Sequence, residues 1–252
     1  YMDIYIIDAV SGKKIKRLVK GSRSINFEEL KFLQPGISWS PESDKIVIAA
    51  KAGASDALYL IDVNSDKQEK IAFDLDGVFT ASWSPNGEKL AFVGNEGGAS
   101  DIYTYEISSK KTTNLTNDVF SDTEPSWSPD GEKIIFVSDR GVMSNGIKTT
   151  AKDMIDHNYE QSDIFIFDLN SKNINQITNT GYNENYPIFS NTENKLFYTG
   201  DYQGTWNLFR YDLDSGKSEP ITNLLTGLFQ LSLTKDDGSL VFSGYSSLGW
   251  DV

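Results

Sequence analysis

Short runs of apolar and aromatic residues, separated by turn residues, recur along the whole chain. The clearest copy is residues 124–138, Glu-Pro-Ser-Trp-Ser-Pro-Asp-Gly-Glu-Lys-Ile-Ile-Phe-Val-Ser. It predicts a strand at 125–128 and, after a Pro-Asp-Gly turn, a strand of β-branched and aromatic residues at 134–137. Proline presets the φ angle of the first turn corner, and glycine tolerates the positive φ that follows. One such hairpin cannot bury its own apolar faces, so its recurrence decides the fold.

The hairpin recurs at a fixed spacing. A serine, or in one copy a threonine, marks each repeat: Ser40, Ser84, Ser128, Ser190 and Thr234. Successive markers are 44, 44, 62 and 44 residues apart, so the third interval contains an inserted loop at 141–161. A third strand follows each hairpin and begins at an acid or amide, and a fourth ends in Leu-Thr-Asn or Ile-Thr-Asn. Because the acid recurs with the repeat, we expect it to make a structural hydrogen bond: Asp3, Asp56, Asp101, Asp163 and Asp251.

Four short strands in a unit of about 44 residues are typical of a β-propeller blade. Each blade buries its faces only against its neighbours, so the blades must stand in a ring. We therefore predict an all-β fold with a single β-propeller domain over 1–252. Trp39, Trp83 and Trp127 share one repeat position. We expect them to pack between blades, with a ligand-stacking ladder as the alternative.

The chain opens with a third strand at Asp3–Asp8 and closes with the start of another at Gly249–Val252. This favours six blades with both ends cut, as in a fragment of a longer chain. The alternative is a ring of five blades, in which the two terminal half-blades fuse.

Composition narrows the classes of partner. The chain has 23 Lys and Arg against 36 Asp and Glu, a net charge of −13. Such a chain is a poor ligand for nucleic acid or for an anionic membrane surface. It has no run of 18 apolar residues, so no membrane span is predicted. With no cysteine, disulfides, thiolate chemistry and cysteine-based zinc sites are excluded.

The sequence contains few residues or motifs that would support a catalytic site. The single histidine, His157, lies in the inserted loop, and no Gly-x-Ser-x-Gly motif occurs. We therefore predict no catalytic residue, no metal site and no cofactor. Carboxylates that lead into the first strands could act as acid–base pairs or hold Ca²⁺, although we expect them to cap turns: Asp74, Asp76, Asp122, Glu124 and Glu184.

Acidic and aromatic residues are predicted to surround the mouth of the central channel, where they would suit a basic or mixed segment of a partner. Loops that interrupt a rigid scaffold often carry binding residues, so the insertion is included. The predicted partner-binding residues are Asp76, Phe79, Asp122, Glu124, His157, Tyr159, Glu184, Tyr186 and Phe229.

The stretch 125–140, with 162–168 and Ile-Thr-Asn at 177–179, resembles the TolB-type, WD40-like β-propeller repeat. The Trp-Ser-Pro signature is lost in the copies at 187–198 and 231–242. The resemblance implies a six-bladed ring, a binding role and an extracytoplasmic bacterial location, periplasmic or associated with the outer membrane.

We therefore expect a non-catalytic binding module of the bacterial cell envelope that docks a protein or peptide through its channel-mouth loops. The alternative is an accessory propeller that gates or docks substrate for a peptidase domain outside this chain. A third hypothesis is a propeller that acts on carbohydrate.

Overall fold

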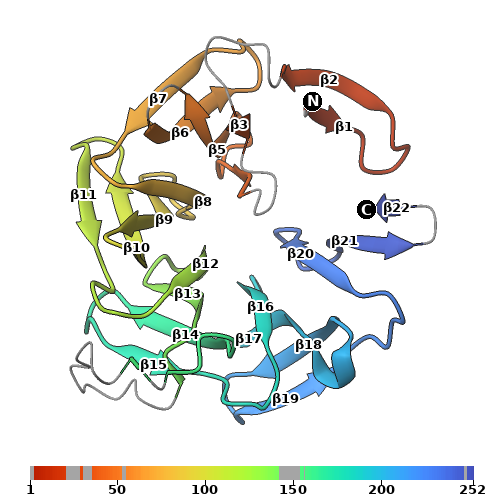
Figure 1. The fold of residues 1–252 in the computed structure, drawn as a ribbon. Coiled ribbons are helices and arrows are strands. Elements are labelled where there is room, and N and C mark those ends of the chain that lie inside the picture. Colours follow the sequence, from red (N-terminus) through yellow and green to blue (C-terminus); the bar gives the residue numbers. More distant parts are fainter. Residues whose placement is uncertain are drawn as a thin grey trace.

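The computed structural model describes residues 3–20, 29–30, 36–52, 55–141, 154–155, 157–246 and 249–252. Their fold is all-β, with antiparallel sheets arranged around a central axis (Figure 1). Most of the link at 21–36 and most of the inserted loop at 141–161 lie outside the described residues.

Each complete blade contains four strands in chain order from the axis outward. Blade 1 contains β4 (Ser38–Trp39), β5 (Lys45–Ala52), β6 (Ser55–Asp62) and β7 (Gln68–Ala72), and β3 (Glu29–Leu30) also pairs with β5. Blade 2 contains β8 (Gly77–Trp83), β9 (Lys89–Glu96), β10 (Ala99–Glu106) and β11 (Lys111–Asn114). Blade 3 contains β12 (Asp122–Trp127), β13 (Lys133–Ser138), β14 (Asp163–Asp168) and β15 (Ile174–Gln176).

Blade 4 contains β16 (Glu184–Phe189), β17 (Lys195–Gly200), β18 (Asn207–Asp212) and β19 (Lys217–Pro220), with the short 3-10 helix η2 (Tyr202–Gly204) between β17 and β18. Blade 5 has three strands, β20 (Leu228–Leu233), β21 (Leu240–Ser246) and β22 (Gly249–Asp251). The N-terminal hairpin, β1 (Ile4–Ile7) and β2 (Lys14–Val19), forms a separate two-stranded sheet.

The described residues thus form five blades of at least three strands, which matches the alternative count. The preferred count of six is wrong to the extent that β1 and β2 form only a hairpin, and in the described residues this hairpin does not pair with blade 5. On the side of the hairpin turns, Lys235 Nζ of blade 5 donates to the carbonyl of Pro41 in blade 1 at 3.3 Å. This contact links the last blade to the first.

Apolar residues are buried mainly between blades. One core cluster joins Trp127, Ile134 and Phe136 of blade 3 to Ala91 and Ile102 of blade 2. Trp127 Nε1 also donates to the carbonyl of Ser82 at 3.2 Å. The prediction that the repeated tryptophans pack between blades is confirmed for Trp83 and Trp127, which are 9% and 8% exposed, whereas Trp39 is 47% exposed.

In blades 1 to 4, the acid or amide that begins the third strand has the structural role predicted for it. Asp101 accepts a hydrogen bond from Thr116 Oγ1 at 3.0 Å, and Thr116 Oγ1 accepts one from the Ile102 amide. In blade 4, Asn207 and Thr222 repeat this arrangement at 3.0 Å. The Thr of the Leu-Thr-Asn motif therefore ties the fourth strand to the start of the third strand.

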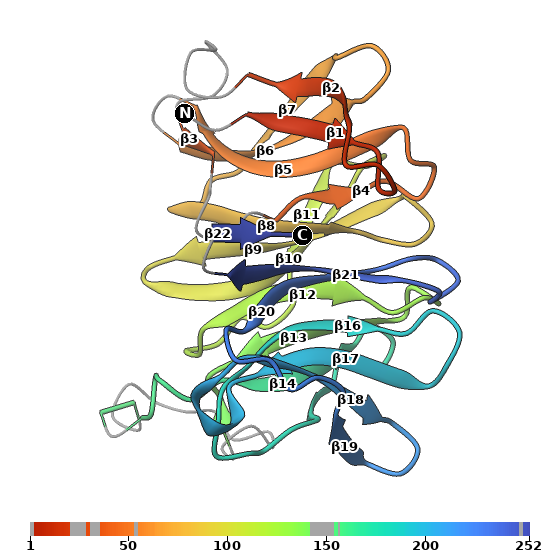
Figure 2. The ribbon, with the colours of Figure 1, turned by 90° about the vertical axis from the view of Figure 1, so that its right-hand side faces the viewer.

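All the first strands begin on the same face of the ring, where the second strands also connect to the third strands. We call it the loop face; the opposite face, with the Pro-Asp-Gly-type turns, is the turn face. Figure 2 shows the ring from the side on which β1 and β2 lie above β21 and β22. No helix among the described residues is long and apolar enough to cross a membrane.

Candidate functional site

The first strands of blades 2 to 5 each contain a register shift typical of a β-bulge, and in three of these blades a residue within it has a positive φ angle. Glu124, Tyr186 and Gln230 have φ angles of 56°, 53° and 58°, and the strand register shifts around each. A residue with positive φ is costly unless its surroundings hold it in place. Glu124 Oε2 accepts a hydrogen bond from the Tyr186 amide at 2.5 Å, which joins the bulges of blades 3 and 4.

The Glu124 carboxyl titrates near neutrality. Burial raises its pKa to about 7, although the Tyr186 amide donates to it. Burial, and then the charge of Glu124, raises the pKa of Tyr186 to about 12. The bulge of blade 3 therefore places a carboxyl at the channel that changes charge within the physiological pH range.

Asp122, at the start of β12, forms a buried ion pair with Arg140. Asp122 is 0% and Arg140 is 2% exposed. Arg140 Nη1 donates to Asp122 Oδ1, and Nη2 donates to Asp122 Oδ2 at 2.8 Å and to Asp118 Oδ2 at 2.6 Å. Burial raises the pKa of Asp122 to about 6 against the pull of the guanidinium, so the carboxyl is ionised at neutral pH.

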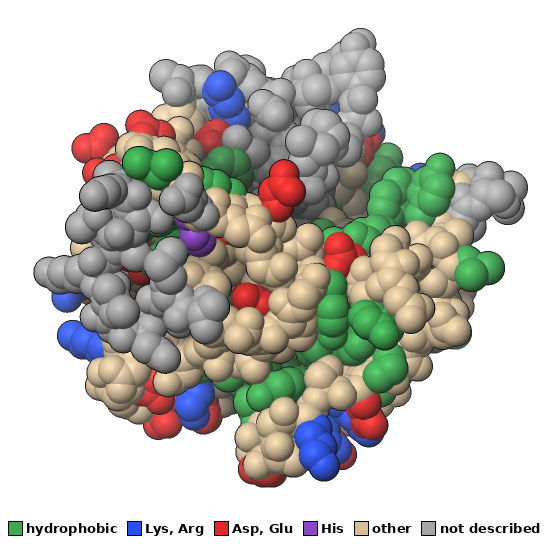
Figure 3. Space-filling model, turned by 60° about the horizontal axis from the view of Figure 1, so that its bottom comes forward, with side chains coloured by type: hydrophobic (Ala, Val, Ile, Leu, Met, Phe, Trp, Pro, Cys, Tyr) green, Lys and Arg blue, Asp and Glu red, His purple; other side chains and the backbone are tan. Residues whose placement is uncertain are grey.

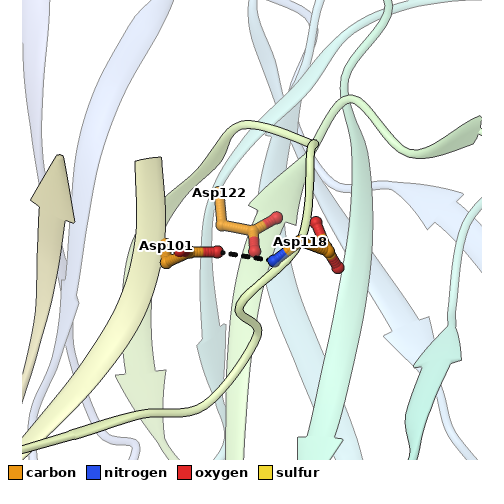
Figure 4. A group of neighbouring side chains, drawn as sticks. All are labelled: Asp101, Asp118 and Asp122. Carbon is orange, nitrogen blue, oxygen red and sulfur yellow. Dashed lines mark hydrogen bonds between the residues drawn. The ribbon is translucent and has the colours of Figure 1, made fainter. Parts of the chain in front are cut away.

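The same pair forms part of an acidic group, Asp101, Asp118 and Asp122, whose oxygens lie within 4.8 Å of one another (Figure 4). The Asp118 amide donates to Asp101 Oδ1 at 3.3 Å. Asp101 also accepts from Asn114 and Thr116, while Arg140 occupies the other two carboxylates. A metal ion would have to displace the guanidinium, so this group is better described as an ion-pair network that joins blades 2 and 3.

Glu184 stands at the Asp122 position of blade 4 without such a cation. It is 0% exposed, and its Oε1 accepts from Thr180 Oγ1 at 3.1 Å. Its Oε2 is buried and accepts no hydrogen bond from the described residues. Burial raises the pKa of Glu184 to about 8, and the charges of Asp163 and Asp201 act in the same direction. Glu184 is therefore mostly protonated at neutral pH.

The difference between blades 3 and 4 has a visible cause. Tyr202 stands at the repeat position of Arg140, and Gly200 at that of Ser138. A Cβ at Gly200 would lie 2.9 Å from Tyr182 Cε2, so only glycine leaves room for this ring. Tyr182 stacks on Phe209 at 5.9 Å. A tyrosine ring thus packs over the strand end where blade 3 has a serine and the arginine.

The inserted loop returns to the loop face at His157. The histidine side chain is 5% exposed, its ring centre lies 5.4 Å from that of Phe120, and its Nε2 lies 3.5 Å from Asp139 Oδ2. Burial raises the pKa of Asp139, and the interaction with His157 acts in the opposite direction and lowers it. Tyr159 packs edge-on against His157 but remains 60% exposed. His157 therefore anchors the loop, and Tyr159 faces solvent.

The predicted partner-binding residues differ in how far their side chains are exposed. Asp122 and Glu184 are fully buried, and their carboxylates accept hydrogen bonds from Arg140 and Thr180, so neither lies on the acidic rim where the sequence analysis placed it. Asp76 is exposed and accepts from the Gly97 amide at 2.9 Å, as expected of a turn cap. Those with partly exposed side chains are Phe79, Glu124, Tyr186 and Phe229.

Most of the exposed large apolar side chains in the described part of the chain fall into two groups. The first lies on the loop face of blades 2 to 4: Val119, Ile155, Tyr159, Tyr202, Ile221 and Leu225. The second lines the opening between the N-terminal hairpin and blade 5. Figure 3 shows His157 at the left and hydrophobic side chains gathered to the right, the side on which Figure 1 places β16–β22.

Sequence reasoning missed two functionally informative positions. Arg140 follows the second strand of the clearest copy of the repeat. The other copies have no arginine at this position, and this difference could have pointed to a special role. Tyr202, 53% exposed, takes its place in blade 4. Only the structure shows that one residue is buried in an ion pair and the other lies on the loop face.

Comparison with known proteins agrees with this architecture. The family described as the TolB beta propeller domain matches residues 25–154. A search of curated proteins gave no match.

Among solved structures, a putative TolB from Agrobacterium tumefaciens superposes with a TM-score of 0.68 at 18% identity, over 84% of this chain and 70% of that one. TolB from Acinetobacter baumannii gives 0.67 at 21% identity, over 97% and 57%. The tricorn protease gives 0.61 at 15% identity, over 85% and 24%. At these identities the structural likeness establishes the fold alone.

Proposed function

This chain belongs to the TolB beta propeller domain family, and we propose on that premise that it is a non-catalytic binding module of the bacterial cell envelope. It docks a protein or peptide partner on the loop face. Its location is extracytoplasmic, as in the TolB proteins it resembles. The blades supply a rigid ring, and the loops between them supply the contacts.

The observation that carries this proposal is the first group of exposed apolar residues. Ile155 is 77%, Tyr159 60%, Tyr202 53% and Leu225 95% exposed, all on the loop face. Apolar side chains gathered on one face of a folded protein mark interaction surfaces more often than scattered ones do. Tyrosine in particular is enriched at protein interfaces, because it offers a large ring with a polar end.

Charge adds a preference among partners. The chain carries a net charge of −13, and Asp76 is exposed beside the channel mouth. Acidic surfaces favour partners with basic segments, chiefly through faster encounter and rejection of acidic competitors. The preferred partner is therefore a protein or peptide with a mixed basic and apolar segment.

The test uses a double variant, Tyr159→Ser with Tyr202→Ser, to capture partners from a bacterial envelope extract. Val10→Ser is the control, because Val10 is 98% exposed at a turn of the N-terminal hairpin, away from the loop face. We expect the double variant to lose the proteins that wild type and control both retain. Capture of the same proteins by all three would show that the loop face is not the docking surface.

The similarity to the tricorn protease supports a second candidate, an accessory propeller that docks substrate for a peptidase domain. This chain spans 24% of that protein, which leaves room for a separate catalytic part there. The rest of the reading frame that encodes this chain distinguishes the two candidates. A peptidase domain encoded in the same reading frame would favour the second, and its absence would favour the first.

A further inference from the structure

A pocket of about 540 Å³ lies between blades 3 and 4 at the turn face, and we call it the turn-face pocket. The hairpin turn of blade 3 forms one side at residues 128–130, and the turn of blade 4 forms the other at residues 190–194. The apolar lining residues are Ile166, Ile177, Phe189 and Leu213. The pocket therefore belongs to two complete neighbouring blades and lies on the other side of the ring from the loop face.

The pocket lies where blade 4 departs from the repeat. Trp83 and Trp127 end the inner strands of blades 2 and 3, and each packs in the cluster shared with the preceding blade. Phe189 stands at this position in blade 4 and packs in the cluster shared with blade 3. Its ring is smaller than an indole and lacks the N–H that Trp127 donates to the Ser82 carbonyl. Phe189 is half-buried, whereas both tryptophans are buried, so the smaller ring leaves space between the blades.

The hairpin turn of blade 4 also differs from the turns of blades 2 and 3. In blade 3, a Cβ added at Gly131 would lie 3.4 Å from Pro85 Cγ of blade 2, so the two turns are in close contact. Glu193 takes the place of this glycine in blade 4, and its amide donates to Ser190 Oγ at 2.9 Å. The Gly131 amide donates instead to a backbone carbonyl of its own turn. On the far side, Asp237 of blade 5 accepts hydrogen bonds from the blade 4 turn and holds it there.

The mouth of the pocket is acidic. Asp130 and Glu193 line it from opposite sides, and both are exposed. The hydrogen bond from Ser128 Oγ lowers the pKa of Asp130, so this carboxyl is ionised at neutral pH. The charged groups that line the pocket or interact with its lining include Asp130, Asp168, Glu193, Asp214 and Asp237, with Lys133 and Lys195. Carboxylates outnumber ammonium groups in this set, which favours a positively charged ligand.

We propose that the turn-face pocket binds the indole of a tryptophan in a positively charged segment of a partner polypeptide. The indole packs on Phe189 and Ile166, in the space that Trp127 fills between blades 2 and 3, and an adjacent lysine or arginine faces Asp130. A pocket of this volume is typical of sites for drug-sized ligands, so the ring and the adjoining backbone both fit. This site is separate from the loop-face docking surface, and neither proposal rests on the other.

The probes are three acetylated and amidated tripeptides, Lys-Trp-Lys, Lys-Ala-Lys and Glu-Trp-Glu. Each is titrated into the ¹⁵N-labelled chain of 252 residues, and binding is followed by the amide chemical shifts. Lys-Trp-Lys should bind saturably at one peptide per chain, and Lys-Ala-Lys should bind at least about tenfold more weakly, because the ring supplies most of the buried area. Glu-Trp-Glu should bind about threefold to tenfold more weakly than Lys-Trp-Lys at low salt, since its charges are repelled.

Phe189→Trp is the most direct variant, because it restores the tryptophan of the other repeats and fills the pocket from within. It should weaken Lys-Trp-Lys binding by about tenfold or more without lowering the thermal unfolding midpoint. Asp130→Asn should weaken binding about threefold, and it preserves the turn, because Asn86 makes the same hydrogen bonds at this position in blade 2. Asp236→Asn is the matched control, because Asp236 occupies this position in blade 5, and it should leave binding unchanged.

Absence of Lys-Trp-Lys binding, or equal affinity for Lys-Trp-Lys and Lys-Ala-Lys, would overturn the proposal. Binding that Phe189→Trp leaves unchanged would also overturn it, because the peptide would then lie elsewhere. If Phe189→Trp folds poorly, equal affinity of Asp130→Asn and Asp236→Asn would have the same consequence. The loop-face variant Tyr159→Ser with Tyr202→Ser should bind Lys-Trp-Lys as wild type does, so capture of envelope partners tests the docking function separately.

Discussion

Glu184→Gln gives the sharpest test of how burial controls this fold. Glu184 is fully buried, its Oε2 accepts no hydrogen bond from the described part of the chain, and burial raises its pKa to about 8 from an ordinary value of 4.5. Because the folded-state pKa is the higher one, the contribution of this carboxyl to stability is complete below pH 4.5 and is lost as the pH rises to about 8.

The interval between these two pKa values, at about 1.4 kcal/mol per unit, corresponds to a loss of up to about 5 kcal/mol in the free energy of unfolding. A neutral glutamine cannot ionise and can still accept from Thr180 Oγ1. We therefore expect Glu184→Gln to match wild type at about pH 5 and to exceed it by several kcal/mol at about pH 9.

Urea denaturation at several pH values measures this difference directly. Glu132→Gln, at an exposed turn position, serves as the control and should follow wild type at every pH. If wild type and Glu184→Gln lose stability in parallel from acid to alkaline pH, the reasoning about the buried carboxyl is refuted.

Three further predictions concern the contacts between blades. Asp122→Asn should destabilise the fold by about 3–5 kcal/mol in urea denaturation, because it leaves the buried Arg140 charge without its main partner; an unchanged midpoint would contradict the ion pair. Trp127→Ala should lower the free energy of unfolding by about 3–5 kcal/mol, and Trp39→Ala should lower it by clearly less, because Trp39 is already half-exposed. Thermal unfolding followed by circular dichroism measures both, and equal losses would contradict the difference in packing. Asp237→Ala should cost about 2 kcal/mol, since the carboxylate accepts hydrogen bonds from Ser190, Asn191 and Thr192 of the neighbouring blade. Those bonds, against the effect of burial, lower the pKa of Asp237, so this contribution should fade only in acid, and a constant difference down to low pH would argue against it.

The sequence alone determined the elements and their repeat. The Trp-Ser-Pro-Asp-Gly hairpins, the acid before each third strand and the Leu-Thr-Asn ending are local signals, and each has the strand or hydrogen bond predicted for it. Local signals suffice here because turn chemistry and β-propensity act over a few neighbouring residues. The position of Trp127 on an inner strand followed from the same spacing.

Only the tertiary structure shows which buried carboxyl groups are ion-paired or protonated, and which repeated tryptophan is exposed. Asp122 and Glu184 occupy one repeat position, yet one is paired with Arg140 and the other is mostly protonated, because burial raises its pKa and Tyr202 stands where blade 3 has the arginine. Such differences depend on residues about twenty positions away in the chain that meet only when neighbouring strands and blades pack. The exposure of Trp39 likewise depends on which of the described strands pack beside it, and no property of its own segment could reveal it.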